Sequence, residues 1–129
     1  MALILVVDDE AAIRKMLRKL FEREGFQVVD APDGVVGLKI ARESRPDLAI
    51  IDLVMPEKEG IETIREMKKM LPDTKIIAMS GGGRSTPDHY LNMARMLGAI
   101  HTFAKPILTD ELLDVVRKIT GEGEVPHPA

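Results

Sequence analysis

The chain has 129 residues, of which 45% are hydrophobic and 30% are charged, and its formal net charge is -3. This profile is typical of one soluble globular domain and leaves little room for a second one. The absence of cysteine excludes disulfides and thiolate chemistry, the three histidines argue against a histidine-built zinc site, and the acidic balance lacks the basic surface that binds nucleic acid.

Five short apolar runs predict the strands of a buried parallel sheet, because Ile, Val and Leu follow one another in them without regular polar alternation. In chain order they are Leu3–Val7, Phe26–Ala31, Leu48–Ile51, Ile76–Met79 and Ile100–Ala104. The first run is too short to span a membrane, and it has neither the basic start nor the cleavage pattern of a signal peptide. We therefore expect a cytoplasmic protein with no membrane partner.

Segments with helical periodicity follow each predicted strand. The first has one apolar stripe and ends at Gly25; its stripe consists of Ile13, Met16, Leu17, Leu20 and Phe21. The others are expected over about 35–44, 61–71, 87–98 and 109–120. Five alternations of strand and helix predict an α/β fold with a parallel sheet covered by helices on both faces. We expect this domain to occupy residues 1–120 and residues 121–129 to form a loose C-terminal tail.

Polar residues follow four of the five predicted strands. The first strand ends in Asp8 and Asp9, the third in Asp52, the fourth in Ser80 and the fifth in Lys105. In an open α/β sheet, ligands bind beyond the carboxyl ends of the strands, where the strand order reverses. If the strand order is 2-1-3-4-5, these four strands are neighbours and their polar side chains converge at one edge.

The chemistry of this set favours a phosphoryl site that uses a metal ion. Three carboxylates at one edge repel each other, so protonation or a cation must relieve their charge. Oxygen ligands without histidine or cysteine favour a hard cation, above all Mg²⁺. A lysine and a hydroxyl suit the oxygens of a phosphoryl group, and a carboxylate is a candidate covalent acceptor. Taken alone, Asp9 fits equally well as the N-cap of the first helix.

These strand ends, in this order and spacing, carry a family likeness. The chain resembles the receiver domains of bacterial two-component response regulators, in particular the single-domain chemotaxis regulators. The resemblance spans roughly residues 3–120 and is carried by Val6–Glu10, Asp52–Pro56, Gly60, Ser80 and Lys105-Pro106. It implies a flavodoxin-like (βα)5 doubly wound sandwich with a five-stranded parallel sheet in the order 2-1-3-4-5.

The resemblance implies a role for each acidic residue. Asp52 corresponds to the phosphoacceptor, which takes a phosphoryl group from the phosphohistidine of a kinase. Asp9 and Asp52 correspond to direct Mg²⁺ ligands, together with the backbone carbonyl of Val54. Asp8 corresponds to a ligand that acts through water.

The resemblance also assigns the phosphoryl-stabilising and switch residues. Ser80 and Lys105 correspond to the hydroxyl and the cation that contact the phosphoryl oxygens, and the bond between Lys105 and Pro106 is usually cis in this family. Many relatives have an aromatic switch residue three positions before the lysine, where this chain has Thr102. Ser80 therefore keeps its switch role, whereas the role of Thr102 stays open.

The resemblance implies a signalling phosphoprotein rather than an enzyme, with only self-phosphorylation from phosphodonors and slow autodephosphorylation. Its expected partners are a histidine kinase or histidine phosphotransfer protein and an unidentified downstream protein, bound through the last helices and strand. Two alternatives remain. One is an Asp-nucleophile phosphatase. Such enzymes have a second Asp two residues after the nucleophile, at the position where this chain has Val54. The other is a receiver that acts as a phosphorylation-independent interaction module.

Overall fold

The computed structural model describes residues 2–53, 60–80 and 87–121. Strands and helices alternate throughout these residues. In chain order they are β1 (Leu3–Val7), α1 (Ala11–Arg23), β2 (Gln27–Ala31), α2 (Gly34–Ser44), β3 (Leu48–Asp52), α3 (Gly60–Met70), β4 (Lys75–Ser80), α4 (Pro87–Met96), β5 (His101–Ala104) and α5 (Thr109–Thr120). The strands pair in parallel in the order β2-β1-β3-β4-β5, which confirms the expected α/β fold and strand order.

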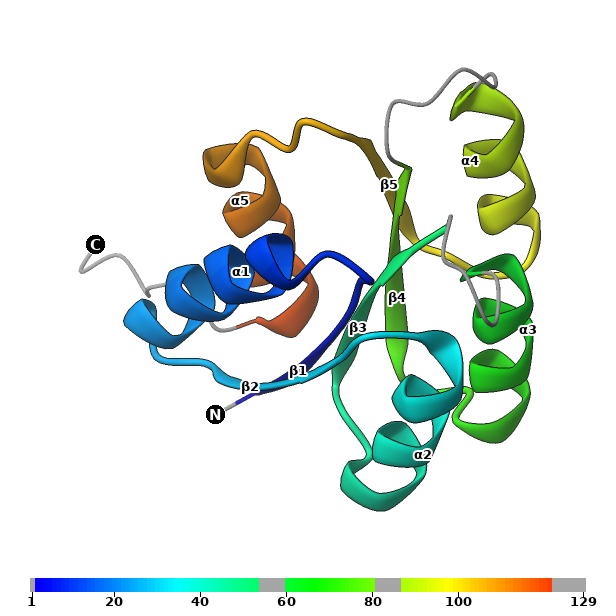
Figure 1. Ribbon diagram of the computed structural model, residues 1–129, viewed down its shortest axis with the longest axis horizontal. Coiled ribbons are helices and arrows are strands. Elements are labelled where there is room, and N and C mark those ends of the chain that lie inside the picture. The colour runs from blue at the N-terminus through cyan, green and yellow to red at the C-terminus, as the bar shows by residue number, and fades with distance from the viewer. Residues whose placement is uncertain (1, 54–59, 81–86, 122–129) are drawn as a thin grey trace.

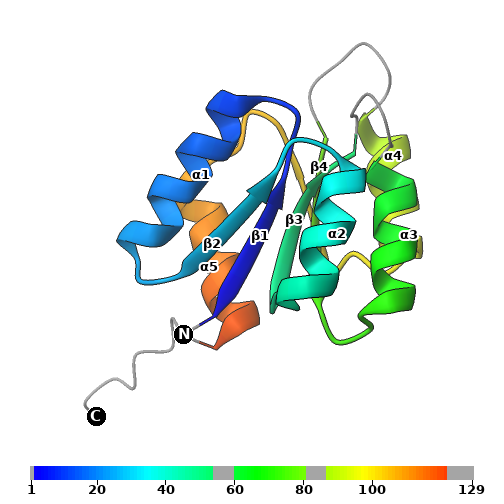
Figure 2. The same cartoon turned by 60° about the horizontal axis from the view of Figure 1, so that its bottom comes forward.

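Helices cover both faces of the sheet (Figure 1). Helices α1 and α5 lie on one face, and α2, α3 and α4 lie on the other, as the rotated view also shows (Figure 2). Successive strand residues point to opposite faces, so Ile4 and Val6 enter the core under α1 and α5, whereas Leu5 and Val7 enter the core under the other three helices. Both faces of the central strands β1, β3 and β4 are buried, which explains why these strands read as continuous apolar runs.

Helix α1 departs from the sequence prediction at two residues. Met16 is 38% exposed, although Leu17 and Phe21 are fully buried. Leu17 and Phe21 form the middle of the apolar stripe that faces the sheet. A helix turns about 100° per residue, so Met16 lies at the side of this stripe. Asp9 is not the N-cap, because that position is held by Glu10, which makes no side-chain capping bond. The capping interpretation of Asp9 is therefore wrong.

Other helix ends follow the local chemistry that the sequence indicates. The Asp33 side chain accepts a hydrogen bond from the Val36 amide at 2.9 Å and caps α2. Gly25 after α1 and Gly121 after α5 have φ angles of 93° and 75°, where a side chain would be strained. Among the described helices, none is both long enough and apolar enough to cross a bilayer.

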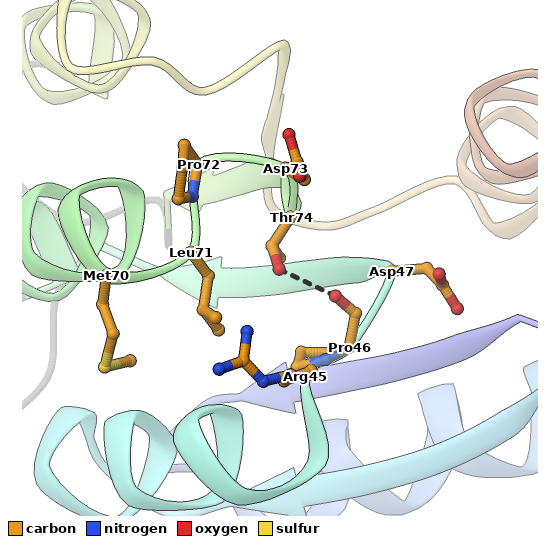
Figure 3. A pocket seen from close by; sticks show the side chains of 8 residues that line it. All are labelled: Arg45, Pro46, Asp47, Met70, Leu71, Pro72, Asp73 and Thr74. Atoms are coloured by element: carbon orange, nitrogen blue, oxygen red, sulfur yellow. Dashed lines mark hydrogen bonds between the residues drawn. The ribbon is translucent and has the colours of Figure 1, made fainter.

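The amino edge of the sheet is held by a buried side-chain contact. The Thr74 hydroxyl, just before β4, donates to the Pro46 carbonyl, just before β3, at 2.8 Å (Figure 3). A cavity of about 270 Å³ lies beside this contact, and its lining includes Arg45 and Asp73. These residues precede their strands, so this cavity lies at the opposite end of the sheet from the polar strand ends.

The carboxyl edge continues the sheet ladder one residue beyond the strands. The Leu53 amide donates to the Met79 carbonyl at 2.8 Å, and the Lys105 amide donates to the Ser80 carbonyl, also at 2.8 Å. The backbones that carry Asp52, Ser80 and Lys105 are therefore hydrogen-bonded side by side. This edge positions the candidate site.

Candidate functional site

A buried lysine–carboxylate cluster occupies the carboxyl edge of the sheet. Lys105 Nζ lies 2.9 Å from Asp8 Oδ2 and 3.5 Å from Asp52 Oδ2. Asp8 is fully buried, Asp52 is 3% exposed and the Lys105 side chain is 11% exposed. The structure thus brings together three of the residues that the sequence places at strand ends, from β1, β3 and β5. The bond between Lys105 and Pro106 is cis, as expected.

Glu10 belongs to the same cluster, although the sequence analysis gave it no role. Its Oε1 lies 3.3 Å from Lys105 Nζ. Asp8, Asp9 and Glu10 also offer carboxylate oxygens that all lie within 4.8 Å of one another. The signal that could have identified Glu10 is its position directly after the two aspartates, in the short segment between β1 and α1.

Burial and charge shift the pKa values of the central pair. Burial raises the pKa of Asp8, although hydrogen bonds from Lys105 and from the Glu10 amide act to lower it. Burial alone would lower the pKa of Lys105, but the hydrogen bond to Asp8 and the charge of Asp52 outweigh it and raise that pKa above its usual value. Lys105 therefore stays positively charged at neutral pH, while burial disfavours the charged form of the Asp8 carboxyl and raises its pKa.

The donor set fits a hard divalent cation. Among the described residues, Asp8, Glu10 and Asp52 surround Lys105, and the carboxylate of Asp9 gathers with those of Asp8 and Glu10. All of these donors are oxygens, which Mg²⁺ prefers over nitrogen or sulfur. The buried charge of Asp8 is a further reason why a cation would be bound favourably here. Val54, whose backbone carbonyl is an expected ligand, lies outside the described residues.

Ser80 and Thr102 lie on neighbouring strands, and they differ in their surroundings. Ser80 ends β4, is 1% exposed and is bonded through its carbonyl to the Lys105 amide. Thr102 on β5 pairs with Ala78 in the sheet register, and its hydroxyl accepts a hydrogen bond from the Arg95 guanidinium of α4 at 3.0 Å. Ser80 therefore borders the lysine–carboxylate cluster, whereas Thr102 links β5 to α4.

Phe103 faces away from Thr102, as expected for neighbouring residues of one strand. Its ring packs against the core under α1 and α5 and stacks on the ring of His101, with the ring centres 4.8 Å apart. The aromatic side chain next to the switch position thus lies on the opposite face of the sheet from Arg95 and α4.

Gly60 brings the start of α3 against the backbone of Asp52. The Gly60 amide donates to the Leu53 carbonyl at 3.2 Å. A Cβ atom on Gly60 would overlap the carbonyl oxygen of Asp52 and would lie 2.5 Å from the Cα atom of Leu53. Only glycine allows this approach, which explains a residue of the motif that has no polar group of its own.

Comparison with known proteins adds independent information. The family model of the response regulator receiver domain matches residues 4–117. The chain is 36% identical over 115 residues to sporulation initiation phosphotransferase F of Bacillus subtilis, which covers 89% of this chain and 90% of that protein. It is 33% identical over 116 residues to the chemotaxis protein CheY of the same organism, which covers 89% of this chain and 94% of that one. A solved receiver domain protein from Clostridium thermocellum superposes with a TM-score of 0.86 at 30% identity, covering 94% and 95% of the two chains.

Proposed function

Because the chain belongs to the response regulator receiver domain family, we propose that it is switched by phosphorylation of Asp52. It is a signalling domain of two-component systems rather than an enzyme, so the phosphatase-like alternative is not retained. The observation that carries the proposal is the position of Asp52. Its carboxylate lies at the carboxyl end of β3, almost fully buried and 3.5 Å from the Lys105 ammonium.

The phosphoryl donor is a histidine kinase or a histidine phosphotransfer protein. An oxygen of Asp52 attacks the phosphorus of the phosphohistidine, an O–P bond forms, and the P–N bond breaks. The imidazole nitrogen keeps the bonding electrons and takes up a proton. Lys105 and the Ser80 hydroxyl contact the transferred phosphoryl oxygens, and their positions beside Asp52 support these roles.

Mg²⁺ completes the site in this proposal. Asp9, Asp52 and the backbone carbonyl of Val54 would hold it directly, and Asp8 would hold it through water. The bound ion supplies positive charge against the negative charge of the phosphoryl oxygens. The carboxylates of Asp8, Asp9 and Glu10, which gather at the carboxyl edge in the described part of the chain, support this assignment.

Phosphorylation changes the charge at Asp52 by adding a dianionic group. Ser80 moves toward the phosphoryl oxygens, and the last strand with its flanking helices passes the change to a downstream protein. Thr102 takes part through its hydrogen bond to Arg95 on α4. We place the domain in the cytoplasm, within residues 1–120, with residues 121–129 as a tail.

The test is phosphorylation by acetyl phosphate in the presence of Mg²⁺, followed by mass spectrometry of the intact protein. We expect the wild type to gain one phosphoryl group and Asp52→Asn to gain none. Asp73→Asn is the matched control, because Asp73 is exposed at the opposite edge of the sheet. Incorporation into Asp52→Asn at the wild-type rate would overturn the assignment.

The phosphorylation-independent alternative has its own readout. Thr102 replaces the aromatic residue found in many relatives, and this departure is the observation that favours the alternative. Amide spectra recorded with Mg²⁺ alone and with Mg²⁺ plus beryllofluoride decide between them. We expect changes that begin at Asp52 and extend to α4 and β5. A spectrum unchanged by beryllofluoride would favour the phosphorylation-independent module.

A further inference from the structure

Arg14 of α1 connects the acidic site to the neighbouring strand β2. Its Nη1 donates to the backbone carbonyl of Asp8 at 2.7 Å, and its Nε donates to Asp30 Oδ2 at 3.1 Å. Arg18, one helical turn later, donates to Asp30 Oδ1 at 3.1 Å. The side chains of Arg14 and Asp30 are 19% and 31% exposed, so the pair is partly shielded from water. The carboxylate of Asp30 thus orients the guanidinium that holds Asp8.

The contact acts on the peptide that joins Asp8 to Asp9. A peptide unit is planar, so fixing its carbonyl oxygen also fixes the direction in which the chain enters Asp9. The amide of Asp8 is held as well, because it donates to the Ala31 carbonyl at 3.1 Å. The backbone of Asp8 is therefore fixed on both sides, by β2 and by a charge-assisted bond from α1.

We propose that Arg14, oriented by Asp30, is a positioning residue for the divalent-cation site that Asp8 and Asp9 help to form. The inference rests on the proposed function, because it concerns the same metal site. Arg14 binds the main chain of Asp8, so it acts on the ligands through their placement. In other proteins, mutation of a residue that hydrogen-bonds to a metal ligand typically weakens metal binding by 10- to 100-fold.

Charge alone predicts the opposite effect, so the sign of the result is informative. A cationic guanidinium near a metal site repels the metal ion, and its removal would then strengthen binding. Asp30 offsets the charge of Arg14, which reduces this repulsion. We therefore expect the positional effect to dominate, so that loss of Arg14 weakens cation binding.

The experiment compares Arg14→Ala with Arg18→Ala. Both variants remove one positive charge from α1 and one partner from Asp30, but only the first removes the bond to the Asp8 carbonyl. Mg²⁺ is titrated into each protein while amide NMR shifts of residues 8–10 are followed. We expect the dissociation constant to rise roughly tenfold in Arg14→Ala and to change by less than about twofold in Arg18→Ala.

A second pair of variants keeps the inference testable if Arg14→Ala folds poorly. Arg14→Lys keeps the charge but lacks the planar fork that spans Asp8 and Asp30, so we expect it to weaken Mg²⁺ binding too. Asp30→Asn removes the carboxylate that orients Arg14, and we expect weaker binding there as well. Unfolding curves in EDTA establish that each variant is folded.

The outcomes separate the inference from the proposed function. Equal Mg²⁺ affinity in Arg14→Ala and Arg18→Ala, or tighter binding in Arg14→Ala, would overturn the positioning role while the metal site itself stood. Failure of the wild type to bind Mg²⁺ at millimolar concentration would instead overturn the metal site, and the inference with it.

Discussion

Asp8 is the residue at which most contacts of the site meet. Its amide and its carbonyl are bonded to Ala31 and Arg14. Its carboxylate accepts from the Glu10 amide and from Lys105 Nζ, at 2.8 and 2.9 Å. Even with these partners, burial disfavours the charged form and raises the pKa of Asp8. The side chain is therefore held in place by several partners, while its burial makes the charged form unfavourable in the folded protein.

Asp8→Asn tests how much the burial of the Asp8 carboxylate lowers the free energy of unfolding. Because the folded-state pKa of Asp8 is raised above the reference value of 3.8, the folded protein binds the proton more tightly than the unfolded chain does. The free energy of unfolding of the wild type thus falls as the pH rises from the reference pKa through the raised value. Asparagine does not titrate and has nearly the same shape, so we expect Asp8→Asn to be the more stable protein at neutral pH in EDTA.

Urea unfolding of both proteins across the acidic range provides the measurement. The stability advantage of Asp8→Asn is expected to shrink as the pH falls toward the reference pKa of Asp8, because the wild-type carboxyl is then protonated. Asp73→Asn serves as the control for loss of an exposed carboxylate. A variant that is less stable than the wild type at every pH would contradict the assigned cost of the buried charge.

Thr102 can be tested by exchanging only its hydroxyl. Thr102→Val removes the acceptor of the Arg95 hydrogen bond, whereas Thr102→Ser keeps it. We expect the valine variant to shift the amide signals of α4, to remain competent for phosphorylation, and to change stability by less than about 0.5 kcal/mol, because the contact is near the surface. Identical spectra for the two variants would show that the hydroxyl does not link β5 to α4.

Sequence reasoning placed the polar residues that end strands but missed those that reach the site from elsewhere. Asp52 and Lys105 follow apolar runs, and parallel topology brings such ends together. Arg14 lies on a helix, and its reach to the Asp8 carbonyl depends on a side-chain conformation that spacing does not reveal. Glu10 was overlooked for a similar reason, because a third acidic residue in a row reads as an ordinary solvated charge.

At the scale of elements, the start of α3 lies close against the backbone of the site. Gly60 lies against the Asp52 and Leu53 backbones, and no side chain can give way there. The approach of α2 to β1 is less restrictive, because a Cβ on Gly37 would meet only the side chain of Val7, at 2.9 Å. The two glycines therefore differ in what a methyl group would displace, which is backbone in one case and a side chain in the other.

Gly60→Ala is expected to lower the free energy of unfolding by about 1–3 kcal/mol, as for other overpacked positions. The displaced backbone carries Asp52, so phosphorylation by acetyl phosphate should also slow. Gly37→Ala is the control, in which better helix propensity partly offsets the contact with Val7. Urea unfolding and the phosphorylation rate are measured on both variants. Equal losses in both would show that the approach of α3 to Asp52 has no special importance.

The whole molecule separates a polar carboxyl edge from an amino edge held by Thr74 and Pro46. The parallel sheet was predictable because each buried strand is followed by a helix, whereas the strand order followed from the resemblance to receiver domains. The identity of the chain's partners could not be predicted from the sequence, because partner choice depends on surface shape and charge around the site. The flank position of Met16 was missed for a related reason, since it depends on how α1 is rotated on the sheet.

A chain that ends at Gly121 tests the extent of the domain. Both core clusters lie between Ala2 and Val116, and the partly buried residues packed on them reach Ile119. We expect the shortened chain to unfold at the same urea concentration as the full chain and to be phosphorylated at the same rate. A loss of more than about 1 kcal/mol would show that residues 122–129 contribute to the fold.

The contact between Asp8 and Lys105 joins residues 97 positions apart, so its two partners are made at different times during synthesis. A nascent chain emerges from the ribosome with its amino terminus first. Asp8, Asp9 and Asp52 are therefore all synthesised before Lys105. Lys105, which contacts Asp8 and Asp52, directly follows β5, one of the two edge strands of the sheet. A chain that has not yet reached residue 105 therefore has the acidic residues of the site but not the lysine that offsets part of their charge.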